Sequence, residues 1–308
     1  MSNRKILLSY VPHGSSVKEY YKQTPEKETW EEYCKFEADF KEKNKVDFVV
    51  LWQNRNIRRK QPGDIILAFR KFCDSLPKEQ ADRCVLFMKT QLADENGTDL
   101  YAVKKVICPK YKVLFAPEVL HPKLMNFLYN LADVTVSLSS AEGFGLSFNE
   151  SLHCGTCISG PVTGGLQDQM RFEDEEGKWI EFNEEFTSNH KGRYKKCGEW
   201  AFPIFPRSRS LQGSIPTPYI FDDHSDPSDL ADRLVEIYNL PKEERDRRGE
   251  VGRAWVLSKE SGMSSTEMCS RFEKCVDQLL ETWESPPKFE MTKFKPKKYS
   301  DNTGIIWD

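Results

Sequence analysis

The sequence lacks several features that would assign it to a common class of protein. Its longest apolar runs, such as Val46 to Trp52, are much shorter than the stretch of about 20 residues that crosses a membrane. Lys and Arg number 45 against 48 Asp and Glu, and the formal charge of −3 gives no broad basic field for nucleic acid. We therefore expect no transmembrane segment and no general nucleic-acid binding.

The nine cysteines follow no repeating frame. Their number is odd and no apolar leader follows the first residues, so we expect reduced thiols in a cytoplasmic protein. Cys154 and Cys157 have the spacing of a redox motif, but they join a helix end to a strand, which favours buried thiols. His121, His190 and His224 have no metal-ligand spacing. The sequence therefore predicts no metal site.

From Asp47 onward, short β-rich runs alternate with amphipathic segments. This alternation is typical of parallel strands joined by crossover helices. We expect six strands, in the runs "VDFVVLW", "RCVLFMK", "YKVLFA", "DVTVSL", "TCISG" and "TPYIF". Helices are expected at about 26–42, 62–75, 98–107, 122–132, 147–154, 227–239, 242–258 and 264–283. The predicted fold class is α/β, a Rossmann-like parallel sheet with helices on both faces.

This pattern divides the chain into three parts. Residues 1–46 hold a strand-like run, "ILLSY", and a charged helix. Residues 47–260 form the Rossmann-like domain, with an insertion at about 171–216 between the fifth and sixth strands. A connection this long is unusual inside a compact lobe, so we expect a hairpin or a functional flap there. Residues 261–308 hold a helix and a Pro- and Lys-rich tail, which is usually disordered unless something holds it.

The stretch "SSAEGFGLSFNESLHCGT" sets Glu142 and Glu150 on either side of a Gly-Phe-Gly turn between a strand and a helix. Ligands of open α/β sheets bind at this carboxyl edge of the strands. Gly143 and Gly145 allow positive φ and close approach to the backbone, and the following helix offers unpaired N–H groups. This combination suits a phosphate.

Glu150 has two interpretations at this stage. Phe148 and Leu152 lie one helical turn apart and face the core, which leaves Glu150 on the outward side, where it can face a cleft. Ser147 and Glu150 also match a capping box, in which the glutamate bonds back to the helix start. The sequence leaves both interpretations open.

A basic loop, "NRNIRRKQPGD", follows the first strand and lies on the same edge of the sheet. We expect Arg55 and Lys60 to face a helix N-terminus, where two cations form a clamp for a diphosphate. For Arg58 and Arg59 a solvated loop is the simpler interpretation. A third loop, the glycine-containing "TGGLQD", follows the fifth strand, so three loops share one edge.

At these residues the sequence resembles the retaining glycosyltransferases of the GT-B fold, also called glycosyl transferases group 1. "EGFGLSFNE" resembles the family's Glu-x7-Glu motif, "NRNIRRKQ" its Gly-Arg…Lys-Gly loop, and "TGGLQD" its Gly-Gly-x-x-Glu/Asp loop in a form close to that of glycogen synthases. The resemblance covers about 6–283 apart from the insertion. It begins at the family's interlobe linker and so covers only the C-terminal, nucleotide-sugar-binding lobe.

The resemblance implies roles for individual residues. Arg55 and Lys60 would neutralise the diphosphate of a UDP-, GDP- or ADP-sugar, and Glu142 would hold the donor sugar. The other residues implied to bind the donor are Gly143, Phe144, Gly145, Leu146, Glu150, Val119 and Gly165. Asn54 and Gln61 stand where the family has glycine, which leaves the geometry of that loop open. The resemblance implies no metal and no other cofactor.

The implied function is a retaining glycosyltransferase that moves a sugar from a nucleotide-sugar to an acceptor, with this chain carrying the donor lobe. The alternative is a non-catalytic or split-enzyme subunit that binds a nucleotide-sugar and needs a separately encoded acceptor lobe or a second copy of itself. A glycosidase also uses paired carboxylates, but it has no use for a phosphate clamp.

Overall fold

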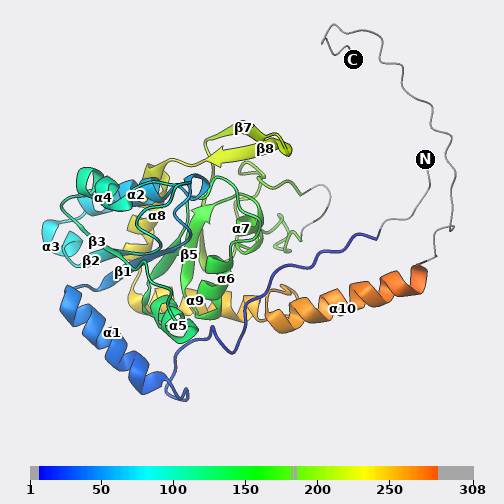
Figure 1. Ribbon diagram of the computed structural model, residues 1–308. Coiled ribbons are helices and arrows are strands. Elements are labelled where there is room, and N and C mark those ends of the chain that lie inside the picture. Colours follow the sequence, from blue (N-terminus) through cyan, green and yellow to red (C-terminus); the bar gives the residue numbers. More distant parts are fainter. Residues whose placement is uncertain (1–6, 182, 184–185, 284–308) are drawn as a thin grey trace, which may run out of the picture.

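The computed structural model describes residues 7–181, 183 and 186–283. A six-stranded parallel sheet runs through its centre in the order β3-β2-β1-β4-β5-β6 (Figure 1). The strands are β1 (Phe48–Gln53), β2 (Cys84–Lys89), β3 (Lys112–Phe115), β4 (Val134–Val136), β5 (Cys157–Pro161) and β6 (Ala201–Ile204). Because the chain builds outward from β1 to β3 and then returns to β4, the loops after β1 and β4 meet at a topological switch point.

Helices cover both faces of this sheet, as the sequence predicts. Those on one face are α2 (Pro62–Asp74), α4 (Leu100–Ile107) and α8 (Pro227–Asn239). Those on the other are α1 (Trp30–Asn44), α5 (Pro122–Leu131), α6 (Leu146–His153) and α9 (Lys242–Val256). Alternate residues of β1 explain this: Val50 and Trp52 join the α2 and α8 core, whereas Val49 and Leu51 join the α5 core.

The helix positions confirm the sequence signals that predicted them. In helix α8 these signals are a cap and a proline. The Asp226 carboxylate accepts a hydrogen bond from the Ser228 N–H at 2.8 Å, and Pro227 occupies the first turn. Three short elements were not predicted: a 3-10 turn (Arg58–Lys60), α3 (Lys78–Ala81) and α7 (Gly165–Asp168). The last helix, α10 (Ser265–Thr282), extends away from the body of the molecule (Figure 1).

The number of parallel strands is confirmed, but the identity of the sixth strand was predicted wrongly. "TPYIF" lies in β8 (Thr217–His224), which pairs antiparallel with β7 (Ser208–Ser214) in a separate hairpin. The sixth strand is β6, inside the expected insertion, and it contains Pro203. An edge strand tolerates a proline, and β6 lies at the edge of the sheet beside β5.

Two further expectations concern the ends of the chain and the thiols. Leu7 to Tyr10 form no strand, so the strand predicted from "ILLSY" is wrong for its described residues, and the Pro- and Lys-rich tail lies outside them. Cys154 and Cys157 are buried free thiols, as predicted, and burial raises the pKa of Cys157 to about 12. None of the described helices combines the length and apolar character needed to cross a membrane.

Candidate functional site

Three loops meet at the carboxyl edge of the sheet, where β1, β4 and β5 end. The Ser140 N–H donates to the Arg59 carbonyl oxygen at 2.8 Å, which joins the basic loop to the Gly-Phe-Gly turn. The Gly165 N–H donates to the Glu142 carbonyl oxygen at 3.2 Å, which joins the third loop, "TGGLQD", to the same turn. The structure therefore brings together the three segments that the sequence placed on one edge.

Lys60 and Glu142 form the charged centre of this edge. The Lys60 ammonium contacts the Glu142 carboxylate, and the two side chains are only 9% and 12% exposed. Burial lowers the pKa of Lys60 to about 7, with the neighbouring Arg59 acting in the same direction. Contact with Glu142 opposes this shift because it favours the charged ammonium. A cation in such a dry position gains strongly from any further negative charge placed beside it.

The second cation at the turn is Arg59, not Arg55. The Arg59 guanidinium donates to the Ala141 carbonyl oxygen at 2.8 Å and lies 3.6 Å from the Glu142 carboxylate. Arg59 is nonetheless 45% exposed, so the solvated loop expected there is compatible with these contacts. Arg55 is exposed and forms two hydrogen bonds with the Asp94 carboxylate, at 2.7 and 3.3 Å. The role predicted for Arg55 would require it to leave this partner.

The backbone between these cations and α2 has the geometry of a glycine. Gln61, directly before α2, has φ 49° and ψ 49°, in the left-handed region that glycine adopts most easily. The glycosyltransferases that the sequence resembles have glycine at this position, and glutamine here adopts the same left-handed backbone at a cost in strain. Gln61 thus maintains the path that places Lys60 at the sheet edge.

The Gly-Phe-Gly turn presents backbone amides at the start of α6. Gly145 has φ 92°. The helix begins at the next residue, Leu146, one residue earlier than predicted. Gly143 is exposed, and a Cβ added to it would meet nothing within 4 Å. Phe144 is buried and its ring meets His13 edge-on, with centroids 5.5 Å apart. Within the described ranges no protein acceptor binds the N–H groups of residues 144–147, so they are available to an anion.

Glu150 faces Tyr129 and does not cap the helix. The Tyr129 hydroxyl donates to the Glu150 carboxylate at 2.6 Å, and no side chain caps the start of α6. The capping-box interpretation is therefore wrong. Burial raises the pKa of Glu150, while hydrogen bonds from Tyr129 and Tyr20 oppose the shift. Glu150 is half-buried, and the hydroxyl of its partner Tyr129 also lies 3.3 Å from Gln53 Oε1 at the end of β1. The ribose contact stays a prediction.

The third loop packs directly on the turn. Gly164 has φ 50° and ψ −143°, and a Cβ there would lie 1.9 Å from the Glu142 carbonyl oxygen. A Cβ on Gly165 would lie 2.5 Å from the Gly143 carbonyl oxygen. Only glycines allow this approach, and the amide of Gly165 is already used by Glu142. Just beyond, Asp168 accepts a hydrogen bond from the Tyr10 hydroxyl at 3.1 Å, and burial raises its pKa to about 6.

Val119 lies on the same edge but farther along it. It follows β3, which is separated from β1 by β2, and its side chain is 95% exposed. A ligand that reaches both Val119 and the Gly-Phe-Gly turn would have to extend across two strands. This is compatible with a long ligand, and the contact with Val119 stays a prediction.

Solved structures resemble this chain, although no protein-family model and no curated protein matches it. The sucrose-phosphate synthase of Thermosynechococcus elongatus has a TM-score of 0.57 and 17% identity, over 89% of this chain and 53% of that one. The trehalose 6-phosphate synthase of Burkholderia multivorans has a TM-score of 0.59 and 12% identity, over 88% and 50%. Anabaena HepE in complex with UDP-glucose has a TM-score of 0.56 and 14% identity, over 87% and 56%.

The chain has the fold of one GT-B lobe. It spans about half the length of the solved structures that it matches. At these identities the likeness shows the fold alone.

Within this GT-B lobe, sequence analysis missed Asp223 in the β7–β8 hairpin. Its side chain is 1% exposed and accepts hydrogen bonds from the Thr163 hydroxyl at 2.6 Å and from Arg209 at 2.7 Å. Its N–H donates to the Ser140 carbonyl oxygen at 2.8 Å. Asp223 therefore fastens the hairpin to two of the three site loops. No local pattern marks this role, because the run "DDHSD" also suits a loop and a helix cap.

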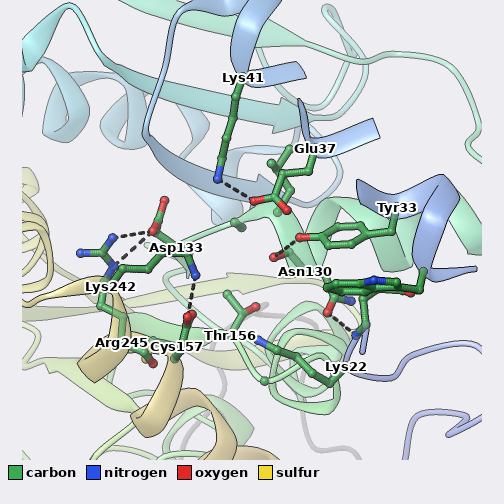
Figure 2. Close-up of a pocket in the computed structure, with 16 residues that line it drawn as sticks. Lys22, Tyr33, Glu37, Lys41, Asn130, Asp133, Thr156, Cys157, Lys242 and Arg245 are labelled. Carbon is green, nitrogen blue, oxygen red and sulfur yellow. Dashed lines mark hydrogen bonds and ion pairs between the residues drawn. The ribbon is translucent and has the colours of Figure 1, made fainter. Parts of the chain in front are cut away.

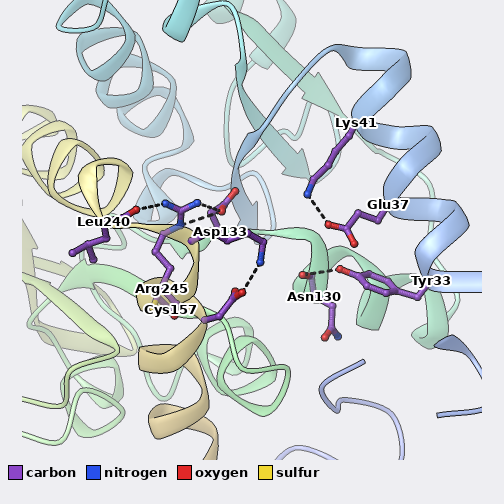
Figure 3. Close-up of polar contacts among 10 residues, drawn as sticks. Tyr33, Glu37, Lys41, Asn130, Asp133, Cys157, Leu240 and Arg245 are labelled. Carbon is purple, nitrogen blue, oxygen red and sulfur yellow. Dashed lines mark hydrogen bonds and ion pairs between the residues drawn. The ribbon is translucent and has the colours of Figure 1, made fainter. Parts of the chain in front are cut away.

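A polar cavity of about 250 Å³ lies at the opposite, amino edge of the lobe, between α1 and the start of α9 (Figure 2). Most of its charges are paired, as in the contact of Arg245 with Asp133 at 2.8 Å and of Lys41 with Glu37 at 2.6 Å (Figure 3), whereas Lys22 forms no ion pair in the described part of the chain. Lys242 likewise pairs with Asp246. No residue predicted to bind the donor lines this cavity.

Proposed function

We propose that this chain is the nucleotide-sugar-binding lobe of a retaining glycosyltransferase. The observation that carries the proposal is the buried Lys60 ammonium, in contact with Glu142 beside open amides of the Gly-Phe-Gly turn. A diphosphate has the negative charge and the acceptor oxygens to satisfy both the cation and the amides. A UDP-, GDP- or ADP-sugar carries this group.

The solved structures support the choice of ligand. One of them is a complex with UDP-glucose, and others are named as sucrose-phosphate and trehalose 6-phosphate synthases. The chain shares their fold and, at the carboxyl edge, presents the cation and amides that a nucleotide diphosphate needs. In this proposal Glu150, which already accepts a hydrogen bond from Tyr129, also accepts hydrogen bonds from the ribose hydroxyls.

In the proposed reaction the bond between the sugar's anomeric carbon and the distal phosphate oxygen breaks, and a bond to the acceptor oxygen forms. Negative charge then develops on the leaving diphosphate, where Lys60, Arg59 and the amides before α6 would stabilise it. The acceptor would enter on the leaving-group side, pass its proton to the departing phosphate and so retain the anomeric configuration. Glu142, released from Lys60, would accept hydrogen bonds from the donor sugar. This scheme uses protein cations in place of a metal ion.

A non-catalytic or split-enzyme subunit is the second candidate. The sequence spans about half the length of the solved structures that it matches, and this candidate assigns the acceptor surface to another chain. In this case the lobe binds the nucleotide-sugar and a separate lobe, or a second copy, supplies the acceptor surface. A cytoplasmic location stays a prediction for both candidates.

The direct test is a thermal-shift and calorimetric panel of UDP-, GDP- and ADP-glucose with the wild type and with Lys60→Gln and Glu150→Gln. A true donor at a hundred times its Kd stabilises the wild type by about 2.7 kcal/mol, and both variants should respond much less. Lys105→Gln, which alters an exposed lysine of α4, is the matched control and should respond as the wild type does. If no nucleotide-sugar stabilises the wild type, the proposal is wrong.

A second measurement separates the two candidates. The chain is incubated with the donor identified above and with a panel of sugar acceptors, and transfer and hydrolysis products are followed. Sustained transfer by the chain alone would rule out the split-enzyme candidate, whereas tight binding with no product would favour it.

A further inference from the structure

The segment before α1 contacts the candidate donor site at several points. Residues 7–24, here called the strap, run past α6 and α5 before the chain enters α1 (Figure 1, dark blue). The His13 ring meets Phe144 of the Gly-Phe-Gly turn, and the Tyr10 hydroxyl donates to Asp168 of the third loop. The strap therefore touches two of the three loops that form the site.

Buried side-chain amides hold the strap on either side of Tyr20. Before it, the Asn149 side chain on α6 accepts a hydrogen bond from the Ser15 N–H at 2.8 Å. After it, the Asn126 side chain on α5 accepts a hydrogen bond from the Gln23 side chain at 2.7 Å. Asn149 and Asn126 are only 0% and 1% exposed. Because these amides are buried and paired, the chain at Tyr20 is fixed relative to both helices.

Two phenols contact the Glu150 carboxylate from different elements. Tyr129 on α5 donates to it at 2.6 Å, and the Tyr20 hydroxyl on the strap hydrogen-bonds the same carboxylate. The two rings meet edge-on, with centroids 5.8 Å apart, and Tyr129 is fully buried while Tyr20 and Glu150 are half-buried. A carboxylate has about four lone-pair sites, so two phenols leave about two of them for other donors. This remaining capacity matches the two free hydroxyls of a nucleotide ribose.

The charged and titratable groups that face Glu150 come from the strap, α5 and α6. They are Glu19, Tyr20, Tyr129 and Cys154, and burial raises the pKa of the Cys154 thiol, which is therefore neutral. Burial raises the pKa of Glu150 and Glu19 acts in the same direction, whereas the hydrogen bonds of the two phenols oppose the rise. Loss of the Tyr20 hydroxyl would therefore raise this pKa further. A protonated carboxyl accepts fewer hydrogen bonds than a carboxylate.

We propose that Tyr20 is a positioning residue, whose hydroxyl fixes the Glu150 carboxylate in the orientation that binds the ribose of the donor. One hydrogen bond from Tyr129 leaves the carboxylate free to turn about its last side-chain torsion, which has broad minima. A second phenol on a separately anchored element removes this freedom. The proposal rests on the proposed function, in which Glu150 binds the ribose. It makes the strap part of the donor site, since a shift of the strap against α6 would carry Tyr20 away from Glu150.

Calorimetry tests this role with UDP-glucose, or the GDP- or ADP-glucose that the panel above identifies, and with its 2′,3′-dideoxyribose analogue. Tyr20→Phe removes only the hydroxyl. It should bind the donor about tenfold more weakly than the wild type, while its affinity for the dideoxy analogue changes by less than about threefold. Equal affinity of the wild type and Tyr20→Phe for the donor would overturn the proposal. An equal loss for both ligands would also overturn it, because the hydroxyl would then serve the site as a whole and not the ribose.

Tyr21→Phe is the matched control for this experiment. Tyr21 is the next residue of the strap, and its hydroxyl lies 3.1 Å from the Thr29 hydroxyl, a contact that does not involve Glu150. This variant should bind both ligands with wild-type affinity. A loss of donor affinity in Tyr21→Phe as large as that in Tyr20→Phe would overturn the specific role of Tyr20.

The pH dependence of donor binding separates positioning from packing. The affinity of the wild type should fall as the pH falls and Glu150 takes up a proton. In Tyr20→Phe the same fall should begin at a pH higher by about one unit, because the carboxylate has lost a hydrogen bond that favours its charged form. Tyr21→Phe should follow the wild-type curve. A Tyr20→Phe curve that coincides with that of the wild type would overturn the proposal.

Carbon-13 NMR of protein labelled at the glutamate carboxyls distinguishes this proposal from the proposed function. Glu150→Gln identifies the Glu150 signal, and its titration midpoint in the absence of ligand should be higher in Tyr20→Phe than in the wild type. If the donor binds the wild type and Tyr20→Phe changes neither midpoint nor affinity, the positioning role alone is wrong. If the midpoint moves but no nucleotide-sugar binds the wild type, the proposed function is wrong, and the contact between Tyr20 and Glu150 is only structural.

Discussion

The two edges of the parallel sheet treat charge in opposite ways. At the amino edge the Arg245 guanidinium is paired with Asp133 and also donates to the Leu240 carbonyl oxygen (Figure 3). Asp133 in turn accepts a hydrogen bond from the Val49 N–H at 2.8 Å. At the carboxyl edge Lys60 is buried against the single carboxylate of Glu142. The backbone N–H groups beside it donate to no acceptor among the described residues.

This difference separates structural charges from charges available for binding. A buried ion pair whose hydrogen bonds are complete holds elements together and gains nothing from a ligand. A buried cation with one partner and open amides beside it is less stable alone and gains from a diphosphate. The same sheet therefore uses its amino edge for stability and offers its carboxyl edge for binding. Four predictions test this division.

The largest effect is expected for Gly164→Ala at the carboxyl edge. The new Cβ would lie 1.9 Å from the Glu142 carbonyl oxygen, on a backbone with positive φ. We expect a loss of about 3 kcal/mol or more in the free energy of unfolding, measured by urea denaturation. The control is Gly143→Ala on the same edge, where nothing lies within 4 Å, and it should change stability by less than about 0.5 kcal/mol. Equal effects would contradict the close packing of the two glycine loops.

A loss of about 3 kcal/mol is expected for Arg245→Met at the amino edge, because it leaves the Asp133 carboxylate buried without its cation. Burial already raises the pKa of Asp133. The loss in the free energy of unfolding relative to the wild type should therefore be greatest at neutral pH. It should shrink as the pH falls and the Asp133 carboxyl takes up a proton. Lys242→Met, which breaks an exposed pair, should cost less than about 0.5 kcal/mol.

Nucleotide-sugar binding tests whether the amino edge takes any part in holding the donor. Arg245→Met should bind the donor with wild-type affinity, since the residue lies at the edge away from the turn. A donor affinity that falls as far in Arg245→Met as in Lys60→Gln would contradict the division between the two edges.

Lys60→Gln should lower the affinity for the donor by about 100-fold, since a buried charge-assisted contact with the diphosphate is lost. Its free energy of unfolding should also fall by about 1–3 kcal/mol, because the Glu142 carboxylate, 12% exposed, keeps only Arg59 as a cationic neighbour, 3.6 Å away. Arg59→Gln should lower the affinity by about tenfold and Arg55→Gln by less than about twofold. Calorimetry of the three variants decides which arginine serves the site; a larger effect at Arg55 would restore the original prediction.

The smallest effect is expected for Asp168→Asn. The pKa of Asp168 is raised to about 6 from 3.8, so the folded chain takes up a proton between these values and becomes more stable as the pH falls through them. Asp168→Asn should therefore be more stable than the wild type by about 2 kcal/mol at pH 8, with the difference vanishing below about pH 4. Asp94→Asn, whose carboxylate is paired with Arg55, should give no such gain at pH 8. Urea denaturation across this pH range measures both.

The sequence predicted the elements of the fold well because their signals are local. The period of apolar residues, Pro227 at a helix start and the caps at Asp99 and Asp226 act within one or two turns of the chain. The sixth strand was mistaken because membership of a sheet depends on a partner. Nothing in "AFPI" or "TPYIF" alone states which of them lies beside β5.

By itself the sequence determined that Lys60, Glu142 and the glycines gather at one edge, since parallel strands end on the same side and each of these residues follows a strand. The tertiary structure alone decided that Arg59, and not Arg55, reaches the turn, and that Tyr129 holds Glu150. It also decided that Asp223 fastens the hairpin to the site. These contacts join residues far apart in the chain, and the loop paths that create them depend on packing that no local pattern specifies.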